Sequence, residues 1–363
     1  MSYDFYTNFK IDNKEDVDNL ISTSGKFANI EDVLSRVMLL MTALKDDDLK
    51  DYARVGERNS PCGLKALIHS NGNYNDYLKY KLSEISLIGI NLPIDILNLP
   101  EGSWFIEIPL TLKKPFISKD DVPLYIIENP VRKDKVFGVP FTSAMAWKGN
   151  LRWTMMKIHL ESKTSDPDGF AETRYKHTLL FGIEKEIEAE AKGWIKYLDE
   201  LCPDARERYR AKLKKEFGKE ETPSLTGMLY FYPTFWNRID IEVINPHDRK
   251  TKIGKNPIYY EVVPAGAKGF FRILYLPFYY LGKTLSEIKI KIIKDLKEVV
   301  SGLKAMMLTY GFSAKKSSGY GVIEDNWDKE VSRLVINRLS NTVRFSNFKE
   351  LEEEIKKILE AEL

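Results

Sequence analysis

The chain of 363 residues is long enough for two or three domains, and its 43% hydrophobic and 12% aromatic content is that of an ordinary folded protein. The 55 basic and 53 acidic side chains leave a net charge of only +2, which argues against a general nucleic-acid coating protein. Any RNA site must therefore be a local basic patch. The two cysteines, Cys62 and Cys202, are too few for a disulfide framework or a cysteine-based zinc site. With no long apolar run and a polar start, the sequence predicts a cytoplasmic protein without a membrane span.

The first hundred residues predict a mainly helical N-terminal region, 1–100. Residues 30–44 carry apolar side chains at helical spacing, and residues 77–85 suggest a second helical piece. Between them, residues 54–63 are rich in turn formers and predict a loop. No catalytic chemistry is readable here. We expect this region either to bind partner proteins or only to pack as part of the core.

Residues 101–325 predict an α+β domain. Residues 104–112 have strand character, with apolar side chains alternating on one face. The further elements expected are strands at 226–232, 240–244, 257–263, 269–276 and about 320–323, and helices at 142–160 and 284–309. This order is what a ferredoxin-like (RRM-like) βαββαβ domain with insertions gives. The sequence also predicts a charged helical insertion at 161–224 and a C-terminal extension, 326–363, with an amphipathic helix from 347.

A glycine- and lysine-rich loop, residues 311–321, follows the second long helix. Its three glycines allow a tight turn and a close approach to a ligand, while Lys315 and Lys316 add two positive charges. Serine hydroxyls, including that of Ser317, are further donors. These parts suit the binding of a phosphodiester backbone. An ordinary glycine-rich turn between a helix and a strand has the same composition.

A second basic segment is residues 137–152. Gly138 and Pro140 predict a turn, and Thr142 or Ser143 predicts a helix cap, so that the helix N-terminus could attract an anion. Lys148 and Arg152, four residues apart, share one helix face. The alternative interpretation is a capped helix with two solvated cations.

Candidates for catalysis are few. Asp120, Asp121 and Glu128 could hold a divalent ion beside a phosphate, although solvated loop acids are the commoner case. His247, in the Asn245-Pro-His247 loop, could act as an acid or base, but no partner is readable near it. His69, His159 and His177 show no metal-ligand spacing. No Walker loop, dinucleotide fingerprint, nucleophile elbow or kinase signature is present.

Taken in order, these segments resemble the RAMP superfamily of CRISPR-associated proteins. Residues 129–152, NPVRKDKVFGVPFTSAMAWKGNLR, resemble the family's "NPV-x-x-D … G-x-PYIPGSS-x-KG-x-LR" segment. The strand 229–231 and residues 245–247, followed by residues 257–264, resemble a second segment, and residues 311–321 resemble the family's C-terminal glycine-rich loop. The resemblance covers roughly residues 104–323, and its motifs are specific only in combination.

The resemblance implies a ferredoxin-like subunit of a type III RNA-guided effector complex that grips guide RNA by its backbone and packs against sibling RAMP subunits. The layout is most similar to the subunit that caps the guide 3′ end in the Cmr complex. The implied RNA-binding residues are Lys148, Arg152, Gly311, Lys315, Lys316, Ser317, Gly319 and Gly321. No cofactor is implied.

The sequence departs from the family pattern at two places. The expected "PGSS" reads Thr-Ser-Ala-Met at 142–145, so a glycine is missing. Cleaving family members carry an aspartate where this chain has Glu128, and a carboxylate misplaced by about 1 Å can lose about a hundredfold in rate. The resemblance therefore favours a subunit that does not cut.

Three alternatives stay open. One is a backbone ribonuclease that cleaves guide-paired target RNA with a metal on Glu128 or on Asp120 and Asp121. Another is a standalone endoribonuclease that matures guide RNA without a metal through His247 or His177. The third is a protein-interaction scaffold without an RNA site.

Overall fold

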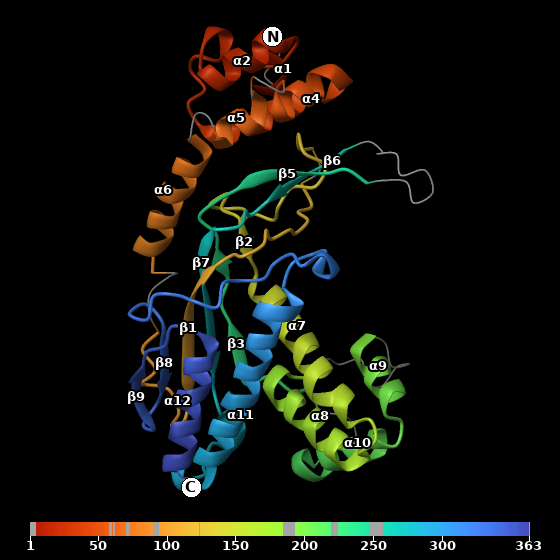
Figure 1. The fold of residues 1–363 in the computed structure, drawn as a ribbon, viewed down its shortest axis with the longest axis vertical. Helices are drawn as coiled ribbons and strands as arrows, with labels where there is room; N and C mark the ends of the chain where they lie inside the picture. Colours follow the sequence, from red (N-terminus) through yellow and green to blue (C-terminus); the bar gives the residue numbers. More distant parts are fainter. Residues whose placement is uncertain are drawn as a thin grey trace.

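The structure, a computed structural model, describes residues 5–57, 60, 62–69, 73–89, 94–122, 124–183, 193–218, 224–246 and 257–362. It is a mixed α+β protein, as the sequence predicts (Figure 1). A group of short helices forms one end of the molecule, an antiparallel sheet forms the middle, and the helical insertion lies beside the sheet at the other end. A search of these residues finds no helix that is long and apolar enough to cross a membrane.

The N-terminal region is helical, as predicted, but its helices are short. They are α1 (Phe5–Asn8), α2 (Lys14–Ser22), α3 (Val33–Leu39), α4 (Asp47–Val55), α5 (Gly63–His69) and α6 (Asn73–Leu87). Asn13, Asp32 and Asp46 start α2, α3 and α4, because each side chain accepts a hydrogen bond from a backbone amide of the first turn. The predicted helix at 30–44 is split into α3 and a 3₁₀ segment, Leu40–Lys45. The predicted loop at 54–63 is shorter, since α4 extends to Val55.

The central sheet has five antiparallel strands in the order β3-β7-β1-β8-β9. They are β1 (Trp104–Thr111), β3 (Leu229–Phe231), β7 (Lys268–Tyr275), β8 (Arg333–Ile336) and β9 (Ser340–Val343). Ile106, Ile108 and Leu110 of β1 are buried in the main core, while Phe105 faces a small second cluster with Ile96 and Leu274. Both faces of β1 are therefore covered, because alternate residues point to opposite sides.

The strand predicted at 320–323 is not formed as such. Ile323 makes only an isolated bridge to Leu112. The strand that pairs with β1 on the side opposite β7 is β8. The polar run Glu324-Asp-Asn326 interrupts the apolar alternation that a longer strand would need. Part of the predicted C-terminal extension therefore belongs to the sheet.

Two long helices pack side by side near the sheet. These are α7 (Ala144–Met155) and α11 (Leu285–Ala305), and each continues as five π-helical residues, Met156–Leu160 and Met306–Tyr310. A Cβ on Gly302 would lie 2.5 Å from Met155 Cγ, so this glycine lets the two helices approach closely. The last helix, α12 (Phe348–Ala361), packs along α11 (Figure 1) and is tied to it by the Lys304–Glu352 and Lys289–Glu362 ion pairs.

The insertion is helical, as predicted, in its described part. It contains α8 (Pro167–Phe181), α9 (Gly193–Leu201) and α10 (Ala205–Phe217). Smaller paired strands flank the central sheet: β2 (Phe141–Thr142) with β4 (Thr234–Phe235), and β5 (Asp240–Ile244) with β6 (Ile258–Val262). The β5–β6 pair lies near the N-terminal helices (Figure 1). One core cluster runs through all these parts.

Candidate nucleic-acid interface

The glycine loop, residues 311–321, is anchored by an aromatic core. Gly311 ends the π-helical turn with φ 76°, and a Cβ there would lie 2.4 Å from the Tyr320 carbonyl oxygen, so only glycine fits. Phe312 is buried, with its ring centroid 4.4 Å from that of Trp147 and 6.3 Å from that of Trp236. The loop therefore begins on a rigid base.

Hydrogen bonds to residues 115–117 fix the two ends of the loop. The buried Ser313 hydroxyl donates to the Ile117 carbonyl at 2.9 Å and accepts from the Ile117 amide at 2.7 Å. The Gly321 amide donates to the Pro115 carbonyl at 2.8 Å. A Cβ on Gly321 would meet Ser313 Cβ at 2.4 Å, which explains the glycine. The two ends of the loop therefore fix its conformation and do not face solvent.

The tip of the loop is the exposed part. Lys315 and Ser317 are exposed, and Lys315 adopts a left-handed conformation with φ 58°. Within the part of the chain that the structure describes, the Lys315 amide donates no backbone hydrogen bond, and residues 314 and 315 form a turn that leads into the 3₁₀ segment Lys316–Ser318. Gly319 has φ 80° and open space around it, so its backbone conformation, not crowding, calls for glycine.

The two lysines have different environments. The Lys315 ammonium lies 4.9 Å from the ring centroid of Tyr260 on β6 and otherwise faces solvent. The Lys316 ammonium donates to the Asn150 side-chain oxygen and lies 4.7 Å from the ring centroid of Trp153, both on α7. Burial lowers the pKa of Lys316. Lys316 therefore docks the loop on α7, while Lys315 projects from it.

Asn150 and Trp153 are contacts that the sequence reasoning missed. Asn150 also donates to the Phe312 carbonyl at 3.3 Å, and the Trp153 ring packs edge-on against Tyr310 with centroids 5.3 Å apart. Their i, i+3 spacing places them on one face of α7 and is the only signal that the sequence offered.

Lys148 and Arg152 do not share that face. A helix turns by about 100° per residue, so each of these residues lies roughly 200° around α7 from Asn150. Ser143 caps the helix by accepting from the Ala146 amide at 3.2 Å, as predicted. The charge of Arg152 acts on His177 and Tyr209 of the helical insertion. The structure thus brings Lys316 to α7, and Lys315 to Tyr260 of β6, but places Lys148 and Arg152 on the side of α7 away from Asn150.

The second segment of the family resemblance lies beside the loop. The Tyr320 hydroxyl donates to Glu242 of β5 at 2.6 Å, and burial together with this carboxylate raises the pKa of Tyr320 to about 12. Tyr260 of β6 contacts Lys315 through its ring. His247 lies outside the described residues, so its predicted acid–base role stays a prediction.

Two of the candidate acids, Glu128 and Asp120, already have structural partners, while Asp121 is exposed. Glu128 pairs with the guanidinium of Arg54, a buried residue of α4 that also donates to the Ile126 carbonyl at 2.7 Å. Asp120 accepts from the amides of Lys133 and Asp121 at 3.2 and 2.9 Å. In the described ranges, no three His, Cys, Asp or Glu side chains are placed to share a metal ion.

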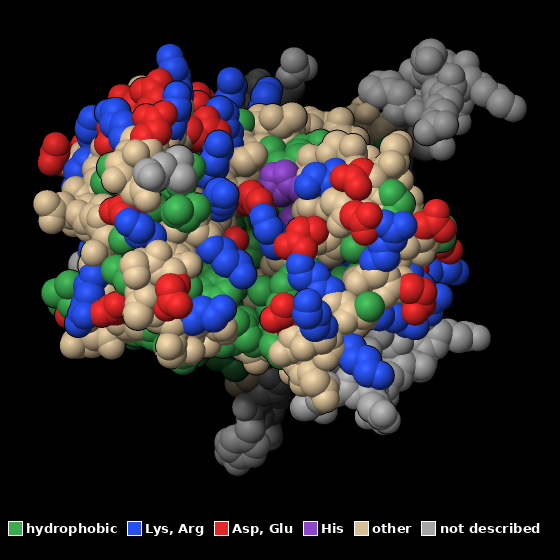
Figure 2. Space-filling view, turned by 90° about the horizontal axis from the view of Figure 1, so that it is seen from below, with side chains coloured by type: hydrophobic (Ala, Val, Ile, Leu, Met, Phe, Trp, Pro, Cys, Tyr) green, Lys and Arg blue, Asp and Glu red, His purple; other side chains and the backbone are tan. Residues whose placement is uncertain are grey.

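His177 and His69, among the described residues, are held by neighbouring protein groups. His177 is only 6% exposed, and burial, together with the charges of neighbouring cations, lowers its pKa to about 3. It is therefore neutral at pH 7 and covered, which does not suit a general acid for RNA. His69 contacts Asp240 at 2.6 Å. Seen from the end opposite the N-terminal helices, basic and acidic side chains alternate over the surface (Figure 2), in keeping with the small net charge.

Comparison with known proteins gives a family. A family model for the RAMP superfamily matches residues 100–324. A search of curated proteins finds no match. Among solved structures, a chain of the type III-B Cmr-beta complex bound to cognate target RNA is similar at 12% identity and a TM-score of 0.37, covering 91% of this chain and 99% of that one.

A second solved structure is a chain of a CRISPR RNA-guided surveillance complex in a pre-nicking state. It has 12% identity and a TM-score of 0.33, and the match covers 64% of this chain and 77% of the other. These scores are too low to carry a structural argument. The family assignment therefore depends on the match over residues 100–324.

Proposed function

Because the chain belongs to the RAMP superfamily, we propose that it is an RNA-binding subunit of a type III CRISPR RNA-guided effector complex. In this proposal it holds the guide RNA by its backbone and packs against sibling subunits. The observation that carries the proposal is the family match over residues 100–324, which includes the glycine loop with its exposed lysine tip.

A ferredoxin-like core is part of this proposal. The strand order β3-β7-β1-β8 with antiparallel neighbours supports it, because a βαββαβ chain with helices after its first and third strands gives this order. Here α7 follows β1 and α11 follows β7. The fourth strand would then be β8, and the glycine loop would lie in the connection that precedes it.

The loop tip would contact phosphates. Lys315 supplies an exposed point charge, and its amide donates no backbone hydrogen bond in the described part of the chain. Backbone amides and lysines bind phosphate without reading sequence. Lys316 would contribute mainly by holding the tip against Asn150 and Trp153.

The test is RNA binding by the Lys315→Ala/Lys316→Ala double variant. We expect weaker binding to every single-stranded RNA sequence and a slope of log K against log salt that is smaller by about 0.7 for each phosphate that is no longer neutralised. The matched control is Lys349→Ala/Lys356→Ala, which removes the same charge from exposed positions of α12. Equal affinity of the loop variant and wild type would favour the scaffold interpretation.

Target cleavage is not part of the proposal. The Glu128 carboxylate shares the neutralisation of the buried Arg54 guanidinium with Asp51, and a buried arginine that loses a partner is costly. A carboxylate committed in this way is a poor metal ligand. We expect Glu128→Ala to lower stability, because it removes one of the two carboxylates that pair with Arg54 and leaves only Asp51 at 3.2 Å, and to leave RNA binding unchanged.

A further inference from the structure

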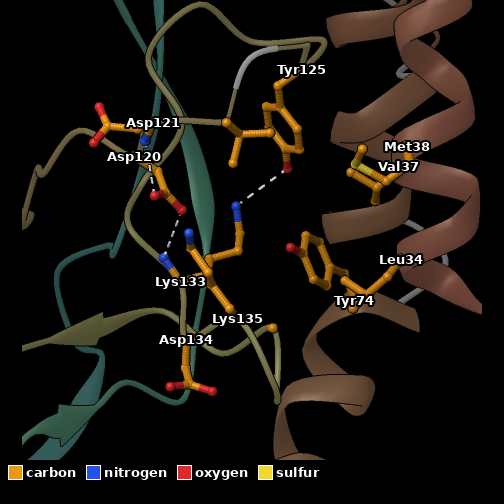
Figure 3. A pocket seen from close by; sticks show the side chains of 12 residues that line it. Leu34, Val37, Met38, Tyr74, Asp120, Asp121, Tyr125, Lys133, Asp134 and Lys135 are labelled. Carbon is orange, nitrogen blue, oxygen red and sulfur yellow. Dashed lines mark hydrogen bonds between the residues drawn. The ribbon is translucent and has the colours of Figure 1, made fainter.

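A cavity of about 340 Å³ lies between the N-terminal helices and the segment 120–138 (Figure 3). Its volume is at the lower end of the range of small-molecule sites, about 300–1,000 Å³. It is far along the chain from the glycine loop. It has two unlike walls, and their chemistry selects a ligand.

One wall is apolar. Leu34, Val37 and Met38 of α3 line it, and Gly138 closes it from the opposite segment. A Cβ on Gly138 would lie 2.8 Å from a Leu34 methyl carbon, so the two sides already touch at this edge. A wall of aliphatic side chains favours the flat, apolar face of a ring system.

The other wall contains Lys133, whose positive charge is paired with a buried carboxylate. The Lys133 ammonium pairs with Glu261, which is fully buried, and also donates to the Tyr125 hydroxyl at 3.3 Å. Tyr125 in turn donates to Glu261 at 2.7 Å. An ammonium has three donors, and two are used here. A third donor of Lys133 is therefore left for an acceptor in the cavity.

Tyr74 of α6 adds a buried hydroxyl at the same place, next to the Tyr125 hydroxyl. Its side chain is fully buried, and its oxygen makes no hydrogen bond of ordinary geometry within the described residues, although the Tyr125 hydroxyl lies close. Figure 3 shows Tyr74 pointing from the helical side toward Lys133 and Tyr125. A tyrosine hydroxyl can donate to Tyr125 and still accept one further hydrogen bond, which a ligand N–H could supply.

Charge narrows the class of ligand. Three carboxylates, Asp120, Asp121 and Asp134, line the cavity against Lys135 and the paired Lys133, so the lining keeps an excess of negative charge that disfavours an anion. A cation would lie beside the ammonium groups of these two lysines. The remaining class is neutral, with a flat apolar face and an edge that carries an acceptor next to a donor.

We propose that this cavity binds a neutral oxo-heterocycle of the nucleobase type. The ring packs on Leu34, Val37 and Met38, the oxo group accepts from Lys133, and the adjacent ring N–H donates to the Tyr74 hydroxyl. The base belongs either to a free nucleoside or to an unpaired nucleotide of an RNA. This inference stands on the cavity alone and does not rest on the proposed function.

The experiment compares inosine with adenosine by isothermal titration of the full chain. The two nucleosides differ in that hypoxanthine offers an oxo group beside an N–H, while adenine offers an amine beside an acceptor. We expect inosine to bind at least about tenfold more tightly, since each such hydrogen bond to a charged or orphaned group is worth about that factor. Tyr74→Phe should reduce this preference, and Met38→Phe, which narrows the cavity, should abolish binding.

The matched control is Tyr80→Phe, because Tyr80 lies on the same helix, is 60% exposed and does not line the cavity. Circular dichroism and urea unfolding confirm that each variant is folded. The Lys315→Ala/Lys316→Ala variant should keep its inosine affinity, which separates this site from the proposed phosphate contacts.

A second titration, with oligonucleotides that contain inosine or adenosine, shows whether the bound base belongs to a free nucleoside or to RNA. Binding of free inosine assigns the site to a nucleoside. If only the oligonucleotides show the preference, and Tyr74→Phe removes it, the ligand is a base within RNA. If neither arm shows a preference that depends on Tyr74 and Met38, the proposal is overturned.

Discussion

At the scale of single residues, buried charges occur with partners. Glu261 holds Lys133, and Glu107 on β1 holds both Arg272 and Arg333. A buried charge that loses its partner keeps its desolvation cost without the compensating attraction. These residues therefore govern stability more than chemistry, and Glu128 with Arg54 belongs to the same class.

The Glu261→Gln substitution tests whether the partner of a buried charge governs stability, because Glu261 is a fully buried carboxylate. The change leaves Lys133 as an unpaired ammonium, and we expect the free energy of unfolding in urea to fall by about 3–5 kcal/mol. Adding Lys133→Met should recover much of the loss, because no charge then stays buried. Asp76→Ala, which breaks an exposed pair with Lys79, should change stability by less than about 1 kcal/mol. A double variant no more stable than Glu261→Gln would contradict the coupling.

His177 gives a pH dependence with a defined sign. Its pKa is about 3 in the folded chain, against an ordinary value of 6.5, so the unfolded chain binds one more proton between these values. Stability is complete above about pH 6.5 and falls as the pH drops toward 3. Between about pH 7.5 and 5.5, wild type should lose about 1.4 kcal/mol that His177→Leu does not lose. Urea unfolding at the two pH values measures the difference, and parallel losses would refute it.

The candidate site was predictable in part. Residue types alone identified Lys315 and Lys316, and the glycines of the loop, because lysines and flexible backbone suit phosphate. The sequence could not show that Lys316 is held by Asn150 and Trp153 or that Lys148 and Arg152 turn away, since these facts depend on how α7 is rotated in the core. Whether any of these residues binds RNA stays a prediction.

At the scale of elements, strong periodicity was a reliable guide. The apolar stripe of α11 and the alternation in β1 predicted both elements nearly to their ends. The strands β8 and β9 were missed, because four-residue strands between polar segments have too short a pattern to stand out. The pairing of β8 with β1 is a long-range contact that no local pattern encodes.

The crossing of α7 and α11 depends on one small residue. Gly302→Val would place a branched side chain against Met155 and Leu151, and we expect a loss of about 1–3 kcal/mol in the free energy of unfolding. The matched control is Gly149→Ala on α7, which has no neighbour within 4 Å of its Cβ and should stabilise by about 0.5–1 kcal/mol. Equal effects of the two substitutions in urea unfolding would contradict a tight crossing at Gly302.

At the scale of the whole molecule, the N-terminal helices and the sheet share one core. A single cluster of buried side chains runs from Ile11 to Ile355. Polar contacts strengthen the connection: Arg54 reaches the Ile126 carbonyl, and the Tyr77 hydroxyl donates to the Phe137 carbonyl at 2.8 Å. A contiguous core of this kind usually marks one folding unit.

This continuity predicts that the N-terminal region does not unfold on its own. All six tryptophans lie at or after residue 104, so their fluorescence reports only on the later part of the chain, while far-ultraviolet circular dichroism also reports on α2 to α6. We expect the two signals to give coincident urea transitions. Arg54→Met, which removes the hydrogen bonds to Ile126 and Glu128, should move both midpoints down together. A dichroism change that precedes the fluorescence change would mean that the helices detach first, and the cavity beside Tyr74 would then open before the sheet unfolds.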